Sequence, residues 1–133
     1  MQYRRRIILL LREENKLMEI VKLIGADVLP DDQKLIIDIA KIIRVGFLQQ
    51  NAYHKDDTYV PLKKQFLMMK TIVDLYETAK KLITLGKPIG LLENSGIYEK
   101  IIKMKYDIPN DRLDMFDDYG KEIVTVIDEL SAR

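Results

Sequence analysis

Apolar residues recur at intervals of three and four positions along most of this chain, which is the spacing of one face of an α-helix. The first such run lies between Arg4 and Ile24 and is followed by Gly25, a residue that commonly ends helices. A second run extends from about Asp31 to Leu48, and the two aspartates that open it suit the positive end of a helix. The pattern therefore predicts two consecutive helices joined by a short turn.

The longest apolar pattern begins at Pro61, a favourable residue for the start of a helix, and continues to Gly86. After a segment punctuated by Gly and Pro, the spacing predicts a short helix over 95–105 and a last helix over 110–130. No segment alternates strictly between apolar and polar residues, and no internal repeat is visible. We therefore predict an all-α fold, a bundle of about five helices that forms a single domain over residues 1–133.

The composition is that of an ordinary globular domain. Of the 133 residues, 47% are hydrophobic, which is enough to bury a core. The formal net charge is +1, so no long-range field recruits nucleic acid or an anionic membrane. The longest apolar run, Ile7 to Leu11, is too short for a signal peptide or a membrane span, so no direct membrane insertion is expected. The absence of cysteine excludes disulfides and fits a reducing cytoplasm.

The sequence contains no recognisable catalytic motif. A nucleotide-hydrolysing enzyme needs a Gly-rich loop that ends in Gly-Lys-Ser or Gly-Lys-Thr, and the six glycines are not spaced for one. The stretch "GKPIG" at 86–90 has a proline where free backbone amides are required. The helical periodicity turns no charged cluster clearly inward, which argues against a small helical enzyme. We therefore predict no catalytic residue and no cofactor for this chain alone, and expect it not to act as an enzyme by itself.

The polar stretch "VGFLQQNAYHKDDTYV" at 45–60 has the residue types of a binding site. Its histidine, His54, lies beside Asp56 and Asp57, but zinc sites that lack both cysteine and a second histidine are uncommon, so no metal site is predicted. A phosphorelay histidine is expected on a helix face, whereas His54 lies outside the periodic segments. A free-standing helical adaptor or phosphorelay module that uses His54 stays an alternative interpretation of the chain.

Two tyrosines of this stretch, Tyr53 and Tyr59, are six residues apart and flank a short polar turn. They are suited to hold a flat ring between them, because stacking on an aromatic side chain stabilises a nucleobase by about 1–3 kcal/mol. In the other interpretation, both rings are buried and anchor the loop to the bundle. Composition alone favours the second interpretation, because buried aromatic residues are common.

The turn between the first two predicted helices, "GADVLPDDQK" at 25–34, also has two interpretations. In the first it is a simple connection with an acidic helix start. In the second it is an exposed contact surface for a partner, with Leu29 at its apex inside a rim formed by Asp27, Asp31 and Asp32. The residue pattern alone does not separate the two interpretations.

Taken together, three stretches resemble the C-terminal helical domain of the catalytic A (alpha) chain of archaeal A-type and vacuolar-type rotary ATPases. They are "LREENKLMEIVKLIGADVLPDDQKLII", "FLQQNAYHKDDTYVPLKKQFLMMKTIVDLYETA" and "YEKIIKMKY". The resemblance covers about residues 10–106, and its most specific piece is "FLQQN" followed by an alanine and an aromatic residue, just before the long helix. It implies a module of a proton- or sodium-translocating ATP synthase or ATPase.

In that family, the turn between the first two helices reaches the central rotor stalk, and the related F-type beta chain carries an acidic loop there. The expected partners are the central stalk subunits, the non-catalytic B subunits and the chain's own upstream nucleotide-binding domain. The letters "DELS" at 128–131 are too far along the chain to be the counterpart of that loop. The resemblance implies a rotor-contact turn made of Asp27, Val28, Leu29, Pro30, Asp31, Asp32 and Gln33.

The resemblance also changes the interpretation of the tyrosines. Related chains line the adenine side of the ATP site with aromatic residues from this stretch, which implies that role for Tyr53 and Tyr59. ATP or ADP with magnesium is then a ligand of the parent subunit, in the soluble head on the cytoplasmic side of the membrane. We expect the nucleotide-binding domain that precedes this one in the family to be absent from this chain, and residues 1–9 to be atypical, as in an excised domain or a truncated reading frame.

Overall fold

The computed structural model describes residues 2–49 and 60–133, and within them the chain is helical and contains no strand. The predicted all-α class is therefore confirmed. The elements in chain order are α1 (Gln2–Ile24), the 3₁₀-helix η1 (Ala26–Val28), α2 (Asp31–Ile42), the π-helix η2 (Ile43–Leu48), α3 (Leu62–Thr84), α4 (Ile89–Glu93), α5 (Ile97–Ile102), α6 (Met104–Asp107) and α7 (Met115–Ser131).

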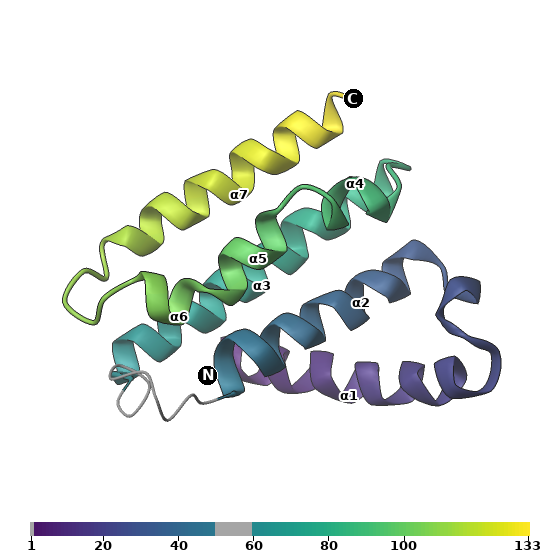
Figure 1. The fold of residues 1–133 in the computed structure, drawn as a ribbon, viewed down its shortest axis with the longest axis horizontal. Helices are drawn as coiled ribbons and strands as arrows, with labels where there is room; N and C mark the ends of the chain where they lie inside the picture. Colours follow the sequence, from purple (N-terminus) through teal and green to yellow (C-terminus); the bar gives the residue numbers. More distant parts are fainter. Residues whose placement is uncertain (1, 50–59) are drawn as a thin grey trace.

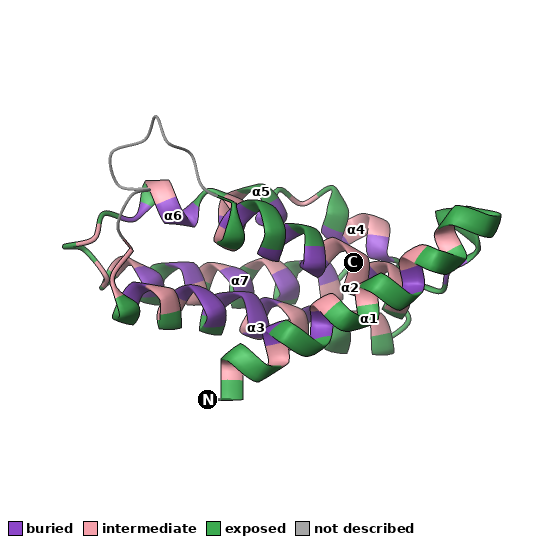
Figure 2. Cartoon of the chain, turned by 90° about the horizontal axis from the view of Figure 1, so that it is seen from below, coloured by how far each residue is buried: buried purple, intermediate pink, exposed green. Residues whose placement is uncertain are grey.

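The long helix α3 is the centre of the bundle. It packs against α1, α2 and α7, and its contact with α7 is the most extensive. Figure 1 shows α7 along one side of the molecule and the α1–α2 hairpin along the other. The short helices α4 and α5 contact both α2 and α7. Figure 2 shows buried residues on the faces that α3, α5 and α7 turn inward, so one continuous core lies between these elements.

The first two helices end and begin as the sequence predicts. Gly25 has a φ of +88°, a conformation that favours glycine, and its amide donates to the Val21 carbonyl at 2.9 Å. Pro30 then provides an extended residue before α2. The third predicted helix is also confirmed, because α3 begins directly after Pro61.

The C-terminal half contains more helices than expected, so that the described residues form seven α-helices in place of about five. The helix predicted over 95–105 is interrupted at Lys103, and the last helix begins at Met115 after a series of turns. The unpredicted helix α4 is capped from far along the chain, since the Ile89 amide donates to Asp31 Oδ2 at 2.9 Å. A cap contributed from 58 residues away leaves no local signal.

The helix α2 runs into the π-helix η2 without a break, so twelve residues of α2 and six of η2 form one rod. At a rise of 1.5 Å per residue the rod is about 27 Å long. Gly46 lies where η2 meets α5, and a Cβ at this position would be 3.0 Å from the Ile102 Cα. Glycine is therefore required there by the close approach of two backbones.

Candidate functional site

The turn between α1 and α2 lies at the end of the rod farthest from η2, at the right of Figure 1. Its 3₁₀-helix η1 is closed by a hydrogen bond from the Leu29 amide to the Ala26 carbonyl at 3.1 Å. Apolar side chains are exposed on the turn and on the last turn of α1: Val28 is 57%, Ile24 62% and Leu23 84% exposed. Asp27, Pro30 and Asp32 are exposed or half-buried beside them, as is Gln33. We call Leu23, Ile24 and Val28 the hairpin tip.

The expectation that Leu29 forms the exposed apex of this turn is wrong. Leu29 is only 6% exposed, because the 3₁₀-helix turns its side chain toward the bundle while the preceding Val28 points outward. The exposed apolar surface that a partner can reach is therefore the hairpin tip. The turn does carry an apolar surface with exposed carboxylates beside it, but the apolar side chains are those of the hairpin tip and not Leu29.

Asp31 was expected in an exposed acidic rim around Leu29, but the structure places it elsewhere. Its side chain is half-buried and accepts the hydrogen bond from the Ile89 amide, so it caps the first turn of α4. This bond ties the start of α2 to α4. Asp27 and Asp32 are the two carboxylates of the turn that stay exposed.

The residues predicted to contact adenine, Tyr53 and Tyr59, and the histidine of the alternative interpretation, His54, lie outside the described residues. The ends of the segment that contains them are described. The Lys105 ammonium donates to the Gln49 carbonyl, just after η2, at 2.7 Å. Because the carbonyls at the end of a helix have no partner within it, a lysine placed there satisfies one of them.

Lys64, in the first turn of α3, also donates hydrogen bonds to backbone carbonyls of another element. It is fully buried, and its Nζ donates to the carbonyls of Lys105 and Ile108 at 2.8 and 2.7 Å and to Asn110 Oδ1 at 2.9 Å. These carbonyls lie at the C-terminal end of α6, where the helix dipole favours a positive charge. Lys64 and Lys105 thus connect the start of α3, the end of α6 and the end of η2, the elements that flank the segment 50–59.

The helical periodicity indicates no inward-facing charged cluster, yet the structure turns these two lysines inward. Lys105 is 4% exposed and Lys64 fully buried. Periodicity misses them because it counts a lysine as a polar residue, and burial of a lysine depends on acceptors contributed by other elements. A lysine at an apolar position of a helical repeat, such as Lys64 four residues before Met68, is the one signal that the sequence offers.

A second polar cluster joins α2 to α4 and α5. The Tyr98 hydroxyl donates to Asp38 Oδ2 at 3.0 Å. Burial and the neighbouring Glu93 carboxyl raise the pKa of Asp38 to about 7, against the smaller lowering effects of Tyr98 and Lys41. Burial, then the Asp38 carboxylate, raises the pKa of Tyr98, so this hydroxyl stays protonated. The cluster is a hydrogen-bonded contact between helices whose charge changes near neutral pH.

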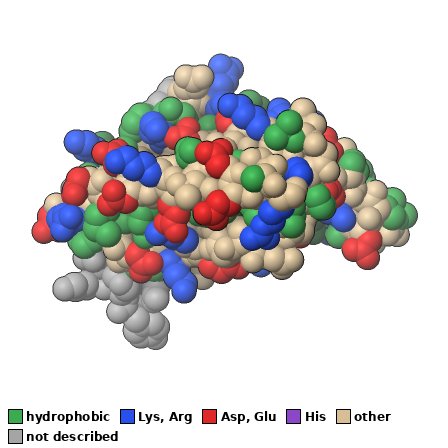
Figure 3. Space-filling model, turned by 90° about the horizontal axis from the view of Figure 1, so that it is seen from above, with side chains coloured by type: hydrophobic (Ala, Val, Ile, Leu, Met, Phe, Trp, Pro, Cys, Tyr) green, Lys and Arg blue, Asp and Glu red, His purple; other side chains and the backbone are tan. Residues whose placement is uncertain are grey.

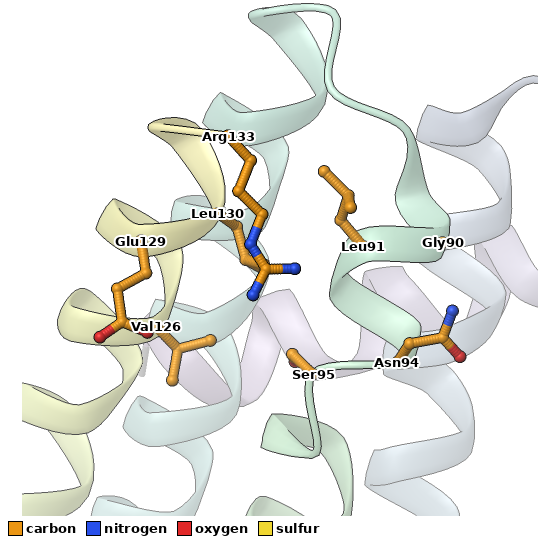
Figure 4. A pocket seen from close by; sticks show the side chains of 8 residues that line it. All are labelled: Gly90, Leu91, Asn94, Ser95, Val126, Glu129, Leu130 and Arg133. Carbon is orange, nitrogen blue, oxygen red and sulfur yellow. The ribbon is translucent and has the colours of Figure 1, made fainter.

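Figure 4 shows a hollow of about 370 Å³ between α4 and the end of α7. It is lined by residues of α7 and the C-terminus and by residues of α4 and the turn after it, and the Arg133 side chain points into the space between them. The Ser95 hydroxyl donates to the Leu92 carbonyl at 2.7 Å and accepts from the Ile97 amide at 3.3 Å, so it serves the turn between α4 and α5. Across residues 2–49 and 60–133, no group of three acidic or histidine side chains is arranged to hold a metal ion.

Figure 3 shows Lys and Arg interspersed with Asp and Glu over one face of the molecule, which agrees with the net charge of +1. In the part of the chain that the structure describes, no helix is long and apolar enough to cross a membrane.

These features define an all-α module built around a rod, with exposed apolar side chains at the turn that precedes it. Residues 1–90, more than half of the chain, match the family described as the C-terminal domain of V and A type ATP synthase. The chain belongs to this family. The resemblance drawn from the three stretches within about residues 10–106 is thereby confirmed.

Relatives of known name agree with this assignment. The V-type ATP synthase alpha chain 2 of Clostridium tetani is 49% identical over 97% of this chain and 22% of its own length. The V-type ATP synthase alpha chain of Halothermothrix orenii is 50% identical over 82% of this chain and 18% of its own. The V-type ATP synthase alpha chain of Thermoanaerobacter sp. is 42% identical over 86% of this chain and 19% of its own. The chain thus spans about a fifth of the length of these relatives.

Proposed function

We propose that this domain transmits movement within an ion-translocating rotary ATP synthase, between a nucleotide-binding domain and the central stalk. The observation that carries the proposal is the unbroken rod of α2 and η2, which joins the hairpin turn at one end to the segment of Tyr53 and Tyr59 at the other. A close-packed helical rod moves as a unit because protein interiors resist compression. A displacement at η2 is therefore delivered about 27 Å away at the turn.

The hairpin tip is the proposed contact with the central stalk. Leu23, Ile24 and Val28 supply apolar area, and the exposed Asp27 and Asp32 supply charge beside it. Apolar residues exposed together mark interaction surfaces, since exposing them to water is unfavourable without a partner. The non-catalytic B subunits are the further partners of the assembled head.

The adenine-side role of Tyr53 and Tyr59 is proposed for the parent subunit, with ATP or ADP and magnesium held by the upstream nucleotide-binding domain. Support comes from both ends of their segment, where Lys105 binds the Gln49 carbonyl and Lys64 fixes the start of α3. The chain alone is proposed to hydrolyse no ATP, and the complex to lie on the cytoplasmic side of the membrane.

The test compares two valines in the assembled rotary complex. Val28→Asp places a charge on the hairpin tip, and Val124→Asp places the same charge on α7 at nearly equal exposure, 57% against 53%. We expect Val28→Asp to lower ion transport per ATP hydrolysed, because a charge without a partner in an apolar contact weakens it. Val124→Asp is expected to leave the ratio unchanged. If both variants transport ions with the native ratio, the turn is not the rotor contact.

A further inference from the structure

The rod is attached to the C-terminal half of the bundle at two levels along α2. At its start, Asp31 Oδ2 accepts a hydrogen bond from the Ile89 amide at 2.9 Å, where α4 begins. About 10 Å farther along α2, at a rise of 1.5 Å per residue, Asp38 Oδ2 accepts from the Tyr98 hydroxyl of α5 at 3.0 Å. The Glu93 carboxyl, at the end of α4, lies within hydrogen-bond reach of the same aspartate. Both ends of α4 are therefore held by acidic side chains of α2.

The two attachments depend differently on protons. The bond to Asp31 comes from a backbone amide, a donor that does not titrate in the physiological range. Asp38 and Glu93 are both acids, and a hydrogen bond between two carboxyl groups exists only while one of them carries a proton. Two ionised carboxylates at this distance repel each other. We call Asp38 and Glu93 the carboxyl pair.

We propose that the carboxyl pair is a proton-operated switch, which fastens the end of α4 to the rod while one proton is shared and releases it when that proton is lost. Asp38 is half-buried and keeps the hydrogen bond from Tyr98 in both states, because a hydroxyl donates to a carboxylate as well as to a carboxylic acid. Glu93 is exposed, so it is the side chain that turns away into water. The first turn of α4 stays bonded to Asp31, and the movement is confined to residues 91–95.

The neighbours of the carboxyl pair set the pH at which the switch operates. Burial and then the Glu93 carboxyl raise the pKa of Asp38 to about 7. The Tyr98 hydroxyl and the Lys41 ammonium lower this pKa to a smaller extent, and Glu99 of α5 acts on Tyr98. Among the described residues, α1 and α3 contribute no hydrogen bond and no ion pair to Asp38. The proton is therefore shared below about pH 7, and the end of α4 is released above it.

The switch changes how much of the bundle is fastened to the rod. While the proton is shared, α4 is held to α2 at both ends and follows the rod when the rod is displaced. After the proton is lost, only the first turn of α4 is held, so the rod is displaced against less of the bundle. This consequence for transmission rests on the proposed function, whereas the switch itself depends only on residues of this chain.

Amide hydrogen exchange of the 133-residue chain at about pH 6 and about pH 8 tests the switch. The reporters are the amides of Asn94 and Ser95, which donate to carbonyls within α4 at 3.0 and 3.2 Å. A helix as short as α4 is not stable without packing, so these bonds open when its end is released. With each rate divided by the intrinsic rate at the same pH, we expect the protection of both amides to fall at least about tenfold between the lower and the higher pH. The centre of α3, residues 68–76, is expected to lose less protection.

Three substitutions connect the change in protection to the carboxyl pair. Glu93→Gln removes one of the two charges, and Asp38→Asn keeps the hydrogen bonds of the protonated acid without a proton to lose. Both variants are expected to show equal protection at the two pH values, because no repulsion develops. Glu99→Gln is the matched control, since this exposed glutamate of α5 makes no hydrogen bond with Asp38, and it is expected to keep the full change. Glu93 is exposed, so its variant decides the question even where Asp38→Asn fails to fold.

Three results would overturn the proposal: equal native protection at both pH values, an equal fall at residues 94–95 and at the centre of α3, or a change that persists in Glu93→Gln. The second result means that pH alters global stability alone. Because the measurement uses the chain without stalk, nucleotide or membrane, it does not depend on the rotor contact. A native transport ratio in Val28→Asp would contradict the proposed function and leave the switch intact, and a missing change in protection would do the reverse.

Discussion

Replacing Lys64 with methionine removes the buried ammonium that joins α3 to the end of α6. Methionine has a similar length and no charge, so it keeps most of the packing volume. Three acceptors lose this donor: the carbonyls of Lys105 and Ile108, and Asn110 Oδ1. The variant therefore removes the ammonium and its interactions while keeping most of the packing.

The magnitude follows from the burial of these groups. Lys64 is fully buried and Ile108 is buried with it, so water does not readily replace the ammonium at the two carbonyls. Leaving a buried acceptor without a donor costs about 1–3 kcal/mol. The methionine variant also avoids the cost of burying a charged ammonium, which offsets part of this loss. We expect a net loss of about 2–4 kcal/mol. This is a large share of the roughly 5–15 kcal/mol that stabilises a typical domain.

Urea unfolding followed by circular dichroism measures this change. The matched control is Lys63→Met, the same substitution at the neighbouring exposed position, for which we expect less than about 0.5 kcal/mol. Amide exchange should also rise around residues 104–108 in the Lys64 variant, because α6 loses its link to α3. If both variants unfold at the same urea concentration, the ammonium of Lys64 does not stabilise the fold, and the reasoning from its burial is refuted.

Two further predictions concern the α2–η2 rod. Gly46→Ala places a methyl group 3.0 Å from the Ile102 Cα, so α5 must shift, and we expect a loss of about 1–3 kcal/mol in thermal unfolding; unchanged stability would contradict the close approach. The pKa of Asp38 is about 7 in the folded state, against an ordinary value of 3.8 for an exposed aspartate. The folded state therefore holds a proton that the unfolded state has already released, so the free energy of unfolding falls as pH rises from about 4 to 7. After discounting for its partial exposure we expect a loss of about 1–2 kcal/mol, absent in Asp38→Asn; parallel pH profiles of the two proteins would refute this.

The sequence determined the elements whose signals are local. The runs that became α1, α2 and α3 are long, periodic and bounded by residues with one favoured role, such as Gly25 at +88° and Pro61 before α3. The family resemblance was likewise readable, since it rests on the order of three sequence stretches within about residues 10–106. In these regions propensity, periodicity and turn chemistry agree.

The tertiary structure decided whatever depends on a partner far along the chain. The first turn of helix α4 is capped by the Asp31 carboxylate of α2. Lys64 is buried because backbone carbonyls at the end of α6 accept its hydrogen bonds. Leu29 and Val28 are adjacent and both apolar, yet the first is 6% and the second 57% exposed, since the 3₁₀-helix turns one side chain toward the bundle. Periodicity describes which face of an element is apolar, but burial of a single side chain is set by the elements packed against it, and these come together only in the fold.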